Sequence, residues 1–383
     1  MLVGRMRRFF RRFFGVVLGL VVAIALAVRV LYGGKGEAYE DLTGPPLLAE
    51  TALELVASTS QPPGNLAVAP DGRLFFTIHP ESRPDSLKLV EWVDGKAVPY
   101  PDLERQSLFD TPLGVRIDRQ NRIWVLDHAH HGIGQPRLFA FDLATGETVH
   151  DLVIDRDAAP IGSFLNDLAI DPAGETIYIA DVSFLRKSPA IVVLDVASGG
   201  TRRILEKHRS VKAQDWLIET PERPMAWLGG LLTLEAGVDG IALSRDGEWL
   251  FYAAMNHSHA FRLRVADVKS DVLNAPGLAA NAEAFGRKPL SDGLTTDLNG
   301  NLLITDVEHG AVHRLSPSGQ LETLIRSTRI RWADGLSYGP DGWLYLTDSA
   351  IPDQMLRSKA HIVFSAPYSI YRFRPGIDGI PGH

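Results

Sequence analysis

The chain of 383 residues contains no cysteine. Disulfide bonds, thiolate zinc sites and thiol nucleophiles are therefore excluded. Several catalytic motifs are missing as well: there is no H-E-x-x-H pair, no P-loop and no dinucleotide-binding glycine pattern. Zincin proteases and nucleotide-dependent enzymes thus have no support from sequence motifs.

Acidic residues are missing from the first 36 positions, which hold seven Lys and Arg. The remainder holds 32 basic against 46 acidic side chains, and so acidic a body is a poor match for nucleic-acid phosphates. We therefore expect no nucleic-acid partner. The 35 glycines and 24 prolines of the chain indicate many turns and hence many short strands.

The basic start is followed by an apolar run, which predicts a signal peptide or signal anchor over residues 1–32. Ala25-Leu26-Ala27 has the small-x-small pattern of a cleavage site, whereas the run extended through Tyr32 is long enough to span a bilayer. Both readings stay open, and we favour the uncleaved anchor. Basic residues on the N-terminal side predict that the body is exported, to the periplasm or another extracytoplasmic space. We expect a monomer that meets the membrane through this segment only, or is secreted.

One hairpin pattern recurs six times along the body. It consists of an apolar strand, a tight Gly or Asn turn and a second apolar strand, and the first strand opens eight residues before the turn. Gly and Asn accept positive φ, which suits tight hairpins. The strand openers are Gly64, Leu113, Asn166, Asp239, Asp292 and Asp334, and the turn residues are Gly72, Asn121, Gly174, Gly247, Gly300 and Gly342.

Successive openers are 49, 53, 73, 53 and 42 residues apart, and a third apolar strand follows each hairpin. This period predicts an all-β, six-bladed β-propeller over residues 50–375, preceded by a linker over 33–49 and followed by a tail over 376–383. The strand at 52–60 is placed to complete the last blade and close the ring. The longest spacing contains an insertion that we expect to cover one face.

The first strand of each hairpin leaves one face of the propeller and the second returns to it. Openers and the residues after each second strand should therefore share one mouth of the channel. The oxygen-rich openers predict a site for a hard divalent cation such as Ca²⁺ or Mg²⁺, because crowded carboxylates repel unless a cation or protons compensate. Asp before Gly also suits a purely structural Asx turn, which is the alternative. The candidate metal ligands are Asn166, Asp239, Asp292 and Asp334.

Half of the 12 histidines follow second strands: His128, His130, His131, His257, His259 and His309. His79 has the same place in the first repeat. Imidazole suits proton transfer near neutral pH or a transition metal, and ordinary polar rim residues are the alternative.

If the protein is an enzyme, we expect proton-transfer chemistry at this mouth. The base would be His128, His131 or His257, and Asp306 or Asp348 would orient it. Expected ligand contacts are Phe164, Asn256, His259, His309 and Trp332.

Five stretches carry a resemblance to a known family: "GSFLNDLAID", "IYIAD", "RRILEKHRSV", "DGIALSRDGEWLFYAAMNHSHAFRL" and "RWADGLSYGPDGWLYLTDS". In order and spacing they resemble the Yellow / major royal jelly protein family, in particular its bacterial, dopachrome-tautomerase-related members. The resemblance covers roughly residues 50–375. It implies a six-bladed propeller, usually secreted, in a family that includes dopachrome-converting enzymes and binders of small amines or sterols. The disulfides of the insect members cannot form here.

A more distant resemblance is to the gluconolactonase / regucalcin propellers, which hold a divalent cation through acidic and Asn openers. Asn166 and the aspartate openers match in type, whereas Gly64 offers no match for the first-blade Glu of that group. The leading hypothesis is an exported propeller that binds a small polar or aromatic molecule at the channel mouth, with tautomerase-like activity if it is an enzyme. A metal-dependent lactone hydrolase and a non-catalytic ligand carrier or protein-interaction propeller are the alternatives.

Overall fold

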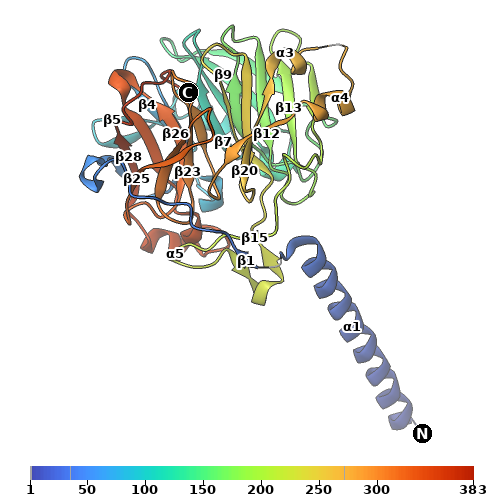
Figure 1. Ribbon diagram of the computed structural model, residues 1–383. Coiled ribbons are helices and arrows are strands. Elements are labelled where there is room, and N and C mark those ends of the chain that lie inside the picture. Colours follow the sequence, from blue (N-terminus) through green and yellow to red (C-terminus); the bar gives the residue numbers. More distant parts are fainter. Residues whose placement is uncertain (1, 35, 271) are drawn as a thin grey trace.

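Six four-stranded sheets surround a central channel in the order of the chain (Figure 1). The computed structural model describes residues 2–34, 36–270 and 272–383. Within each sheet neighbouring strands run antiparallel, and the first strand of each sheet contacts the first strand of the next around the ring. This arrangement confirms the predicted six-bladed propeller.

The first three blades follow one another without interruption. Blade one contains β3 (Pro63–Val68), β4 (Leu74–Ile78), β5 (Leu89–Val93) and β6 (Lys96–Pro99). Blade two contains β7 (Pro112–Ile117), β8 (Arg122–Asp127), β9 (Arg137–Asp142) and β10 (Thr148–Val153). Blade three contains β11 (Leu165–Ile170), β12 (Thr176–Asp181), β13 (Ala190–Asp195) and β14 (Thr201–Ile204).

The other three blades follow an insertion and end with the closure of the ring. Blade four contains β18 (Val238–Leu243), β19 (Trp249–Ala254), β20 (His259–Arg264) and β21 (Glu283–Arg287). Blade five contains β22 (Leu294–Thr296), β23 (Leu302–Asp306), β24 (Ala311–Leu315) and β25 (Leu321–Arg326). Blade six contains β26 (Ala333–Tyr338), β27 (Leu344–Asp348), β28 (Tyr368–Phe373) and β2 (Glu54–Thr59).

The ring is closed by β2, which comes from the start of the body and pairs with β28 from its end. The predicted closing strand is therefore confirmed. Ala57 of β2 is buried, and it packs with apolar residues of blades one and six. Closure leaves each inner strand with a neighbour on both sides, so that all six strand openers lie around one channel.

All six predicted turn residues adopt positive φ, between +62° at Asn121 and +90° at Gly72. The six hairpins therefore turn where the repeat pattern predicts. In five of them the register of the first two strands shifts at the opener, as between Pro63 and Leu66 and between Leu165 and Leu168. Such a bulge redirects side chains, and here it turns the openers toward the channel.

Short helical segments occupy the loops between strands. The α-helical ones are α2 (Ala129–Gly132), α3 (Val265–Val268), α4 (Ala275–Ala280) and α5 (Lys359–Phe364). The 3₁₀ segments are η1 (Glu50–Ala52), η2 (Pro80–Ser82), η3 (Arg105–Leu108), η4 (Leu228–Gly230), η5 (Pro340–Gly342) and η6 (Ile351–Asp353).

The insertion between β14 and β18 covers the channel mouth, as expected. It contains β15 (Trp216–Leu217), β16 (Ala226–Trp227) and β17 (Leu232–Thr233), and its apolar side chains pack with Trp332 and Ile351 from blade six. β1 (Glu37–Ala38) pairs with β15, and further along the same segment Leu48 N donates to Leu324 O. The stretch expected to be a linker thus lies along the propeller and is bound to it.

The opposite end of the channel is crossed by the last residues of the chain. Tyr338 N donates to His383 O at 2.8 Å, Gly382 N donates back to Tyr338 O at 2.9 Å, and Ile117 N donates to Gly382 O at 3.1 Å. His383 is partly buried and lines a small pocket together with Arg116. The last residues thus cover the end of the propeller opposite the insertion (Figure 1).

The N-terminal segment forms one long helix, α1 (Leu2–Tyr32), that projects away from the propeller (Figure 1). Its stretch Phe9–Tyr32 is long and apolar enough to cross a bilayer and is not buried against the protein. Length, composition and position are compatible both with a signal sequence and with an anchor.

The closing strand offers a matched test of the ring. We expect Ala57→Asp to lower the free energy of unfolding by about 3 kcal/mol or more, because it buries an unpaired carboxylate at the closure. Leu55→Asp lies on the same strand, where the leucine is 57% exposed, and should cost about 0.5 kcal/mol or less. Thermal unfolding of both variants measures the difference. Equal losses would contradict the role given to the buried face of β2.

Candidate functional site

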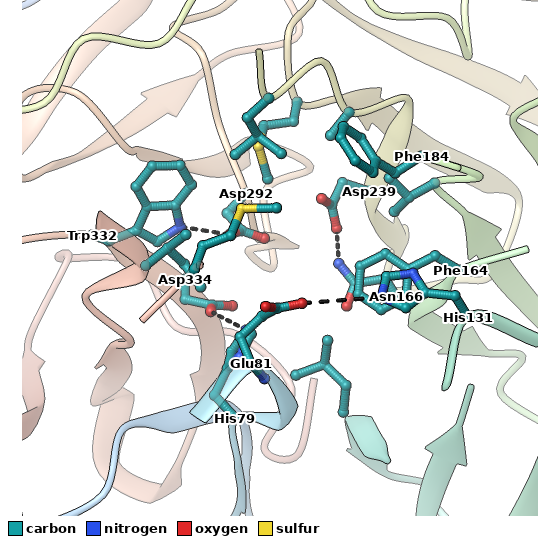
Figure 2. Close-up of a pocket in the computed structure, with 17 residues that line it drawn as sticks. His79, Glu81, His131, Phe164, Asn166, Phe184, Asp239, Asp292, Trp332 and Asp334 are labelled. Carbon is teal, nitrogen blue, oxygen red and sulfur yellow. Dashed lines mark hydrogen bonds and ion pairs between the residues drawn. The ribbon is translucent and has the colours of Figure 1, made fainter. Parts of the chain in front are cut away.

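The floor of a cavity at the channel mouth is formed by strand openers from four blades (Figure 2). These are Asn166, Asp239, Asp292 and Asp334, all four of the predicted metal ligands. Leu113, the opener of blade two, also lines the cavity. The repeat spacing thus predicts which side chains meet at the floor.

The glycine after each aspartate opener has a separate role. A Cβ atom on Gly240 would lie 2.7 Å from the backbone oxygen of Asp292 in the next blade, and Gly293 meets the backbone oxygen of Asp334 in the same way. Only glycine lets adjacent inner strands approach this closely. The Asp-Gly pair therefore combines a side chain directed into the channel with a backbone that fits against the next blade.

The floor carboxylates are held by few hydrogen bonds. Trp332 Nε1 donates to Asp292 Oδ2 at 2.7 Å, and Asn166 Nδ2 donates to the Asp239 carboxylate (Figure 2). The nearest basic atom on Asp334 is His79 Nε2, which lies 4.0 Å from Oδ2. Within the described chain this histidine contact is the only ion pair of the three aspartates.

The three aspartates consequently hold protons more tightly than aspartate does in water. Burial raises the pKa of Asp292 to about 7. Burial, and next the repulsion of Asp292, raise the pKa of Asp239 and of Asp334 well above the ordinary value. The cavity floor is thus a place where bound positive charge would be stabilised.

A polar layer closes the channel below the floor. Arg116 donates to Asp167 Oδ2 at 2.9 Å and to Asn65 Oδ1 at 2.7 Å, and Asn65 Nδ2 donates to Asp167 Oδ1 at 3.1 Å. All three side chains are buried. Because this network satisfies its own charges, it acts as the base of the cavity rather than as a binding group.

The walls of the cavity are apolar. Trp332 and Phe164, two of the predicted ligand contacts, lie there beside the opener side chains. The remaining apolar lining comes from the insertion and from loops after second strands: Val182, Phe184, Leu234, Ala236, Met255, Ile351 and Met355. A ligand with an apolar body would therefore be covered by these walls while its polar end meets the floor.

Glu81, His79 and His131 form the polar side of the rim (Figure 2). Glu81 Oε1 lies 4.0 Å from His131 Nε2, and its backbone N donates to His79 Nδ1 at 3.2 Å. The carboxylate of Glu81 points toward the floor carboxylates. Burial raises the pKa of Glu81, which adds a fourth proton-holding acid to the cavity.

His131 reaches the cavity on a strained piece of backbone. Four consecutive residues, from Ala129 to Gly132, have φ between +48° and +68°, which makes α2 a single left-handed turn. Left-handed turns of non-glycine residues are costly and cluster at functional sites. Asp127 holds the start of the turn by accepting from Ala129 N at 2.8 Å and from Thr111 N at 2.9 Å.

The histidines of this rim are neutral at neutral pH. Burial lowers the pKa of His79 to about 3 and lowers those of His131 and His128 as well. His128 lies behind Phe164, 4.6 Å between ring centroids, and does not line the cavity. Within the described residues His128 Nε2 and His131 Nδ1 are buried without a hydrogen-bond partner.

Three other predicted residues follow β19 and lie outside the cavity. His257 and His259 line a separate surface pocket with Arg209, Lys212 and Gln214, and burial lowers the pKa of His257 to about 3. Asn256 is buried and holds backbone, donating to Leu234 O and accepting from Ala236 N. The structure therefore does not place these three side chains with His131.

The two predicted orienting carboxylates contact other groups. Asp306 accepts from His309 at 3.0 Å and from His313 at 3.1 Å, so it does not orient His128, His131 or His257. Asp348 accepts from the backbone of Trp332 and pairs with Arg331 at 3.2 Å.

His309 lies on the short turn after β23, outside the cavity lining. Its Nε2 lies 3.6 Å from Asp41 Oδ2. The Asp306 hydrogen bonds raise its pKa. Several of the His and Asp side chains that follow second strands therefore form hydrogen bonds with near neighbours rather than line the cavity.

Glu81 is the functional candidate that the sequence analysis did not single out. It follows the second strand of blade one, two residues after His79, in the position examined for the other blades. Pro80 begins a 3₁₀ turn there, and this turn directs Glu81 inward. The first blade therefore contributes an acid to the cavity from the loop after its second strand rather than from its opener.

The fit of a metal ion to this donor set is only partial. The floor offers the carboxylate and amide oxygens that hard cations prefer. In residues 2–34, 36–270 and 272–383, however, no three His, Asp or Glu side chains stand where they could share one ion. The chemistry of the donors suits a divalent cation, whereas their arrangement in this structure does not form a three-residue metal site.

The fold and the cavity define a class: a six-bladed propeller with one blind, acidic, apolar-walled pocket at the channel mouth. The sequence profile of the major royal jelly protein family matches residues 111–327, more than half of the chain. The protein belongs to this family. No curated protein sequence matches the chain.

Solved structures with the same fold are distant in sequence. A luciferin-regenerating enzyme is 12% identical with a TM-score of 0.55, and the match covers 86% of this chain and 97% of that one. Regucalcin of Agrobacterium tumefaciens, described as a calcium-binding protein, is 16% identical with a TM-score of 0.52, covering 86% and 96%. A gluconolactonase of Xanthomonas campestris is 16% identical with a TM-score of 0.53, covering 88% and 97%. At these identities the likeness establishes the fold alone.

The raised pKa of Asp292 has a consequence for stability. The folded state holds this proton up to about pH 7, whereas the unfolded chain releases it near pH 4, so its contribution to stability is lost as pH rises between these values. We expect Asp292→Asn to flatten the decline and to raise the free energy of unfolding at pH 8 by roughly 1–3 kcal/mol. Thermal midpoints of both proteins from pH 4.5 to 8 measure the effect. Parallel curves for the two proteins would contradict the buried-acid description.

Proposed function

We propose that this protein is an exported propeller whose cavity binds a small aromatic or otherwise apolar molecule carrying a protonated amine. One observation carries the proposal: three buried aspartates form the floor of an apolar-walled pocket, and within the described residues their one ion-pair partner is His79, whose pKa burial lowers to about 3. A ligand ammonium would meet the carboxylates, and its body would lie against Phe164, Trp332 and their neighbours. The resemblance to amine-binding family members points in the same direction.

The spacing of the carboxylates supports an organic cation. Asp239, Asp292 and Asp334 come from successive blades and, among the described residues, do not form a three-ligand metal site. An alkylammonium group has three donors and can bridge acceptors that lie farther apart than the ligands of a metal ion.

We further propose that α1 anchors the propeller outside the cytoplasm. Five arginines lie within the first 12 residues, before the uncharged apolar run that starts at Phe13, which supports translocation of the body. The last residues of α1 contact the propeller itself, which supports retention of the helix in the mature protein. A cleaved signal peptide and a secreted body are the alternative.

Comparing the binding of an amine with that of its neutral counterpart distinguishes recognition of the charge from burial of the apolar body. At ten times its Kd, tyramine should stabilise the protein by about 1.4 kcal/mol, and tyrosol, which carries a hydroxyl in place of the amine, should not. Asp334→Asn should abolish the shift, whereas Asp341→Asn, at the turn of the same blade on the far face, should leave it intact. Thermal shift measures all six combinations of compound and protein. Equal shifts for the two compounds would contradict a site selective for charge.

A divalent cation is the second candidate for the same floor. The oxygen donors favour Ca²⁺ or Mg²⁺, and one structural neighbour is described as calcium-binding. The same thermal assay with calcium chloride, magnesium chloride and a chelator tests it. Stabilisation by the ion alone at micromolar concentration would favour the cation, and with it a lactone hydrolase of the gluconolactonase type.

His131 and Glu81 give the cavity the means for a proton-transfer isomerisation. His131 is neutral and able to accept a proton, Glu81 holds a proton more tightly than in water, and the two lie 4.0 Å apart. An isomerisation of the tautomerase type would move one proton from a substrate carbon to His131 and return a proton to another substrate atom, with no net change in oxidation state.

Neighbouring histidines on α2 provide the matched test of this step. With dopachrome as substrate, His131→Gln should lower turnover by about 10²-fold, as expected for the loss of a general base. His130→Gln removes the exposed neighbour on the same left-handed turn and should leave turnover unchanged. Product formation is followed by absorbance. Binding of amines with no turnover by the unmodified protein would instead identify a carrier.

A further inference from the structure

Exposed apolar side chains gather on the loops of the cavity face. Loops that join second to third strands, or one blade to the next, all lie on this face. Seven of their large apolar side chains are more than 60% exposed: Leu103, Ile133, Ile161, Leu228, Leu356, Val363 and Phe364. On the turns of the opposite face, within the described residues, only Val272 is exposed to this degree. The two ends of the propeller therefore differ in the surface they offer to solvent.

The apolar side chains frame the cavity itself. Leu185 directly follows Phe184, and Leu356 directly follows Met355, both of which line the cavity. Ile133 stands two residues after His131 on the left-handed turn. The chain thus turns from cavity wall to exposed apolar rim within one or two residues at three places.

The end of α1 is fixed to the same rim. Tyr32, the last residue of the apolar stretch, donates through its hydroxyl to Leu185 O at 2.8 Å, and its ring lies 6.3 Å from that of Phe184. Thr233 Oγ1 of the insertion donates to Tyr32 O at 3.1 Å and accepts from Gly34 N at 2.8 Å. No free length of chain separates the helix from the cavity mouth.

Residues after the end of α1 also attach this segment to the propeller. Tyr39 stacks edge-on against Trp216 with centroids 5.1 Å apart, and its hydroxyl donates to Lys288 O at 3.1 Å. Tyr32 is both the end of the apolar stretch of α1 and part of the contacts at the rim. The surface of a bilayer that contains α1 therefore lies at the rim. Tyrosine at the end of a membrane span commonly marks this interface.

We infer that the cavity face of the propeller rests on the outer surface of the bilayer that holds α1, so that the cavity opens onto the lipid interface. The inference rests on the anchor proposed above. Charged groups are present on the same face, such as the pair of Lys359 with Asp85, which places the contact at the depth of the headgroups. Small amphiphilic amines concentrate at this depth, and the cavity would take its ligand from there.

The absence of cysteine makes a direct test possible. Leu228→Cys, Phe364→Cys and Val272→Cys each give the full-length chain one labelling position, and all three side chains are at least 76% exposed. Each variant is labelled with an environment-sensitive fluorophore and reconstituted into phosphatidylcholine vesicles. Quenching by doxyl-labelled phosphatidylcholine reports contact with lipid, and quenching by iodide reports contact with water.

The contact predicts opposite results at the two faces. Doxyl lipid should lower the emission of labels at positions 228 and 364 by about half and protect them from iodide, whereas the label at 272 should respond to iodide alone. Iodide quenching that is equal at all three positions in vesicle-bound protein would overturn the inference.

Flotation and ligand binding separate this result from failure of the earlier proposals. A chain that does not float with vesicles has no anchor, which overturns the anchor and the contact together. A chain that floats and shows lipid contact at 228 and 364 but gives no tyramine shift supports the contact and contradicts the amine ligand.

Discussion

Closure of the ring by β2 and β28 is the contact on which the rest of the molecule depends. It joins the start of the body to its end, and it gives the inner strands of blades six and one a fixed distance. Because the openers lie on these inner strands, the same closure determines how near Asp334 comes to Asn166, Asp239 and Asp292. The cavity is therefore a property of the whole ring, and no blade contains it alone.

Most of the fold, and the floor of the site, follow from the repeat. A turn glycine eight residues after a strand opener fixes a hairpin, and six hairpins of this length fix a ring. The openers then meet because inner strands have no freedom to point elsewhere, and the Asp-Gly pairs show both the inward side chain and the close strand packing. This constraint on the inner strands is why the floor residues could be predicted from the sequence: Asn166, Asp239, Asp292 and Asp334.

The rim residues were harder to predict from the sequence, because their positions depend on loop conformation. Residues after second strands start one strand farther from the axis, and only some loops bring them back. A left-handed turn carries His131 inward and a 3₁₀ turn after Pro80 carries Glu81 inward, and no period in the sequence encodes either. The loop after β19 points His257 to a different pocket, and the tight turn after β23 pairs His309 with Asp306. Residue type alone did not distinguish these cases.

The blind end of the channel limits how any ligand can pass through the protein. His383 and the layer of Arg116, Asp167 and Asn65 close the route opposite the mouth. A ligand of the proposed site would leave by the mouth through which it entered, so a product or a released cargo would occupy the path of the next molecule. The entering and the leaving molecule would then compete for the same free form of the protein. Accumulation of the leaving molecule outside the mouth would slow further binding, however favourable the reaction or release step is.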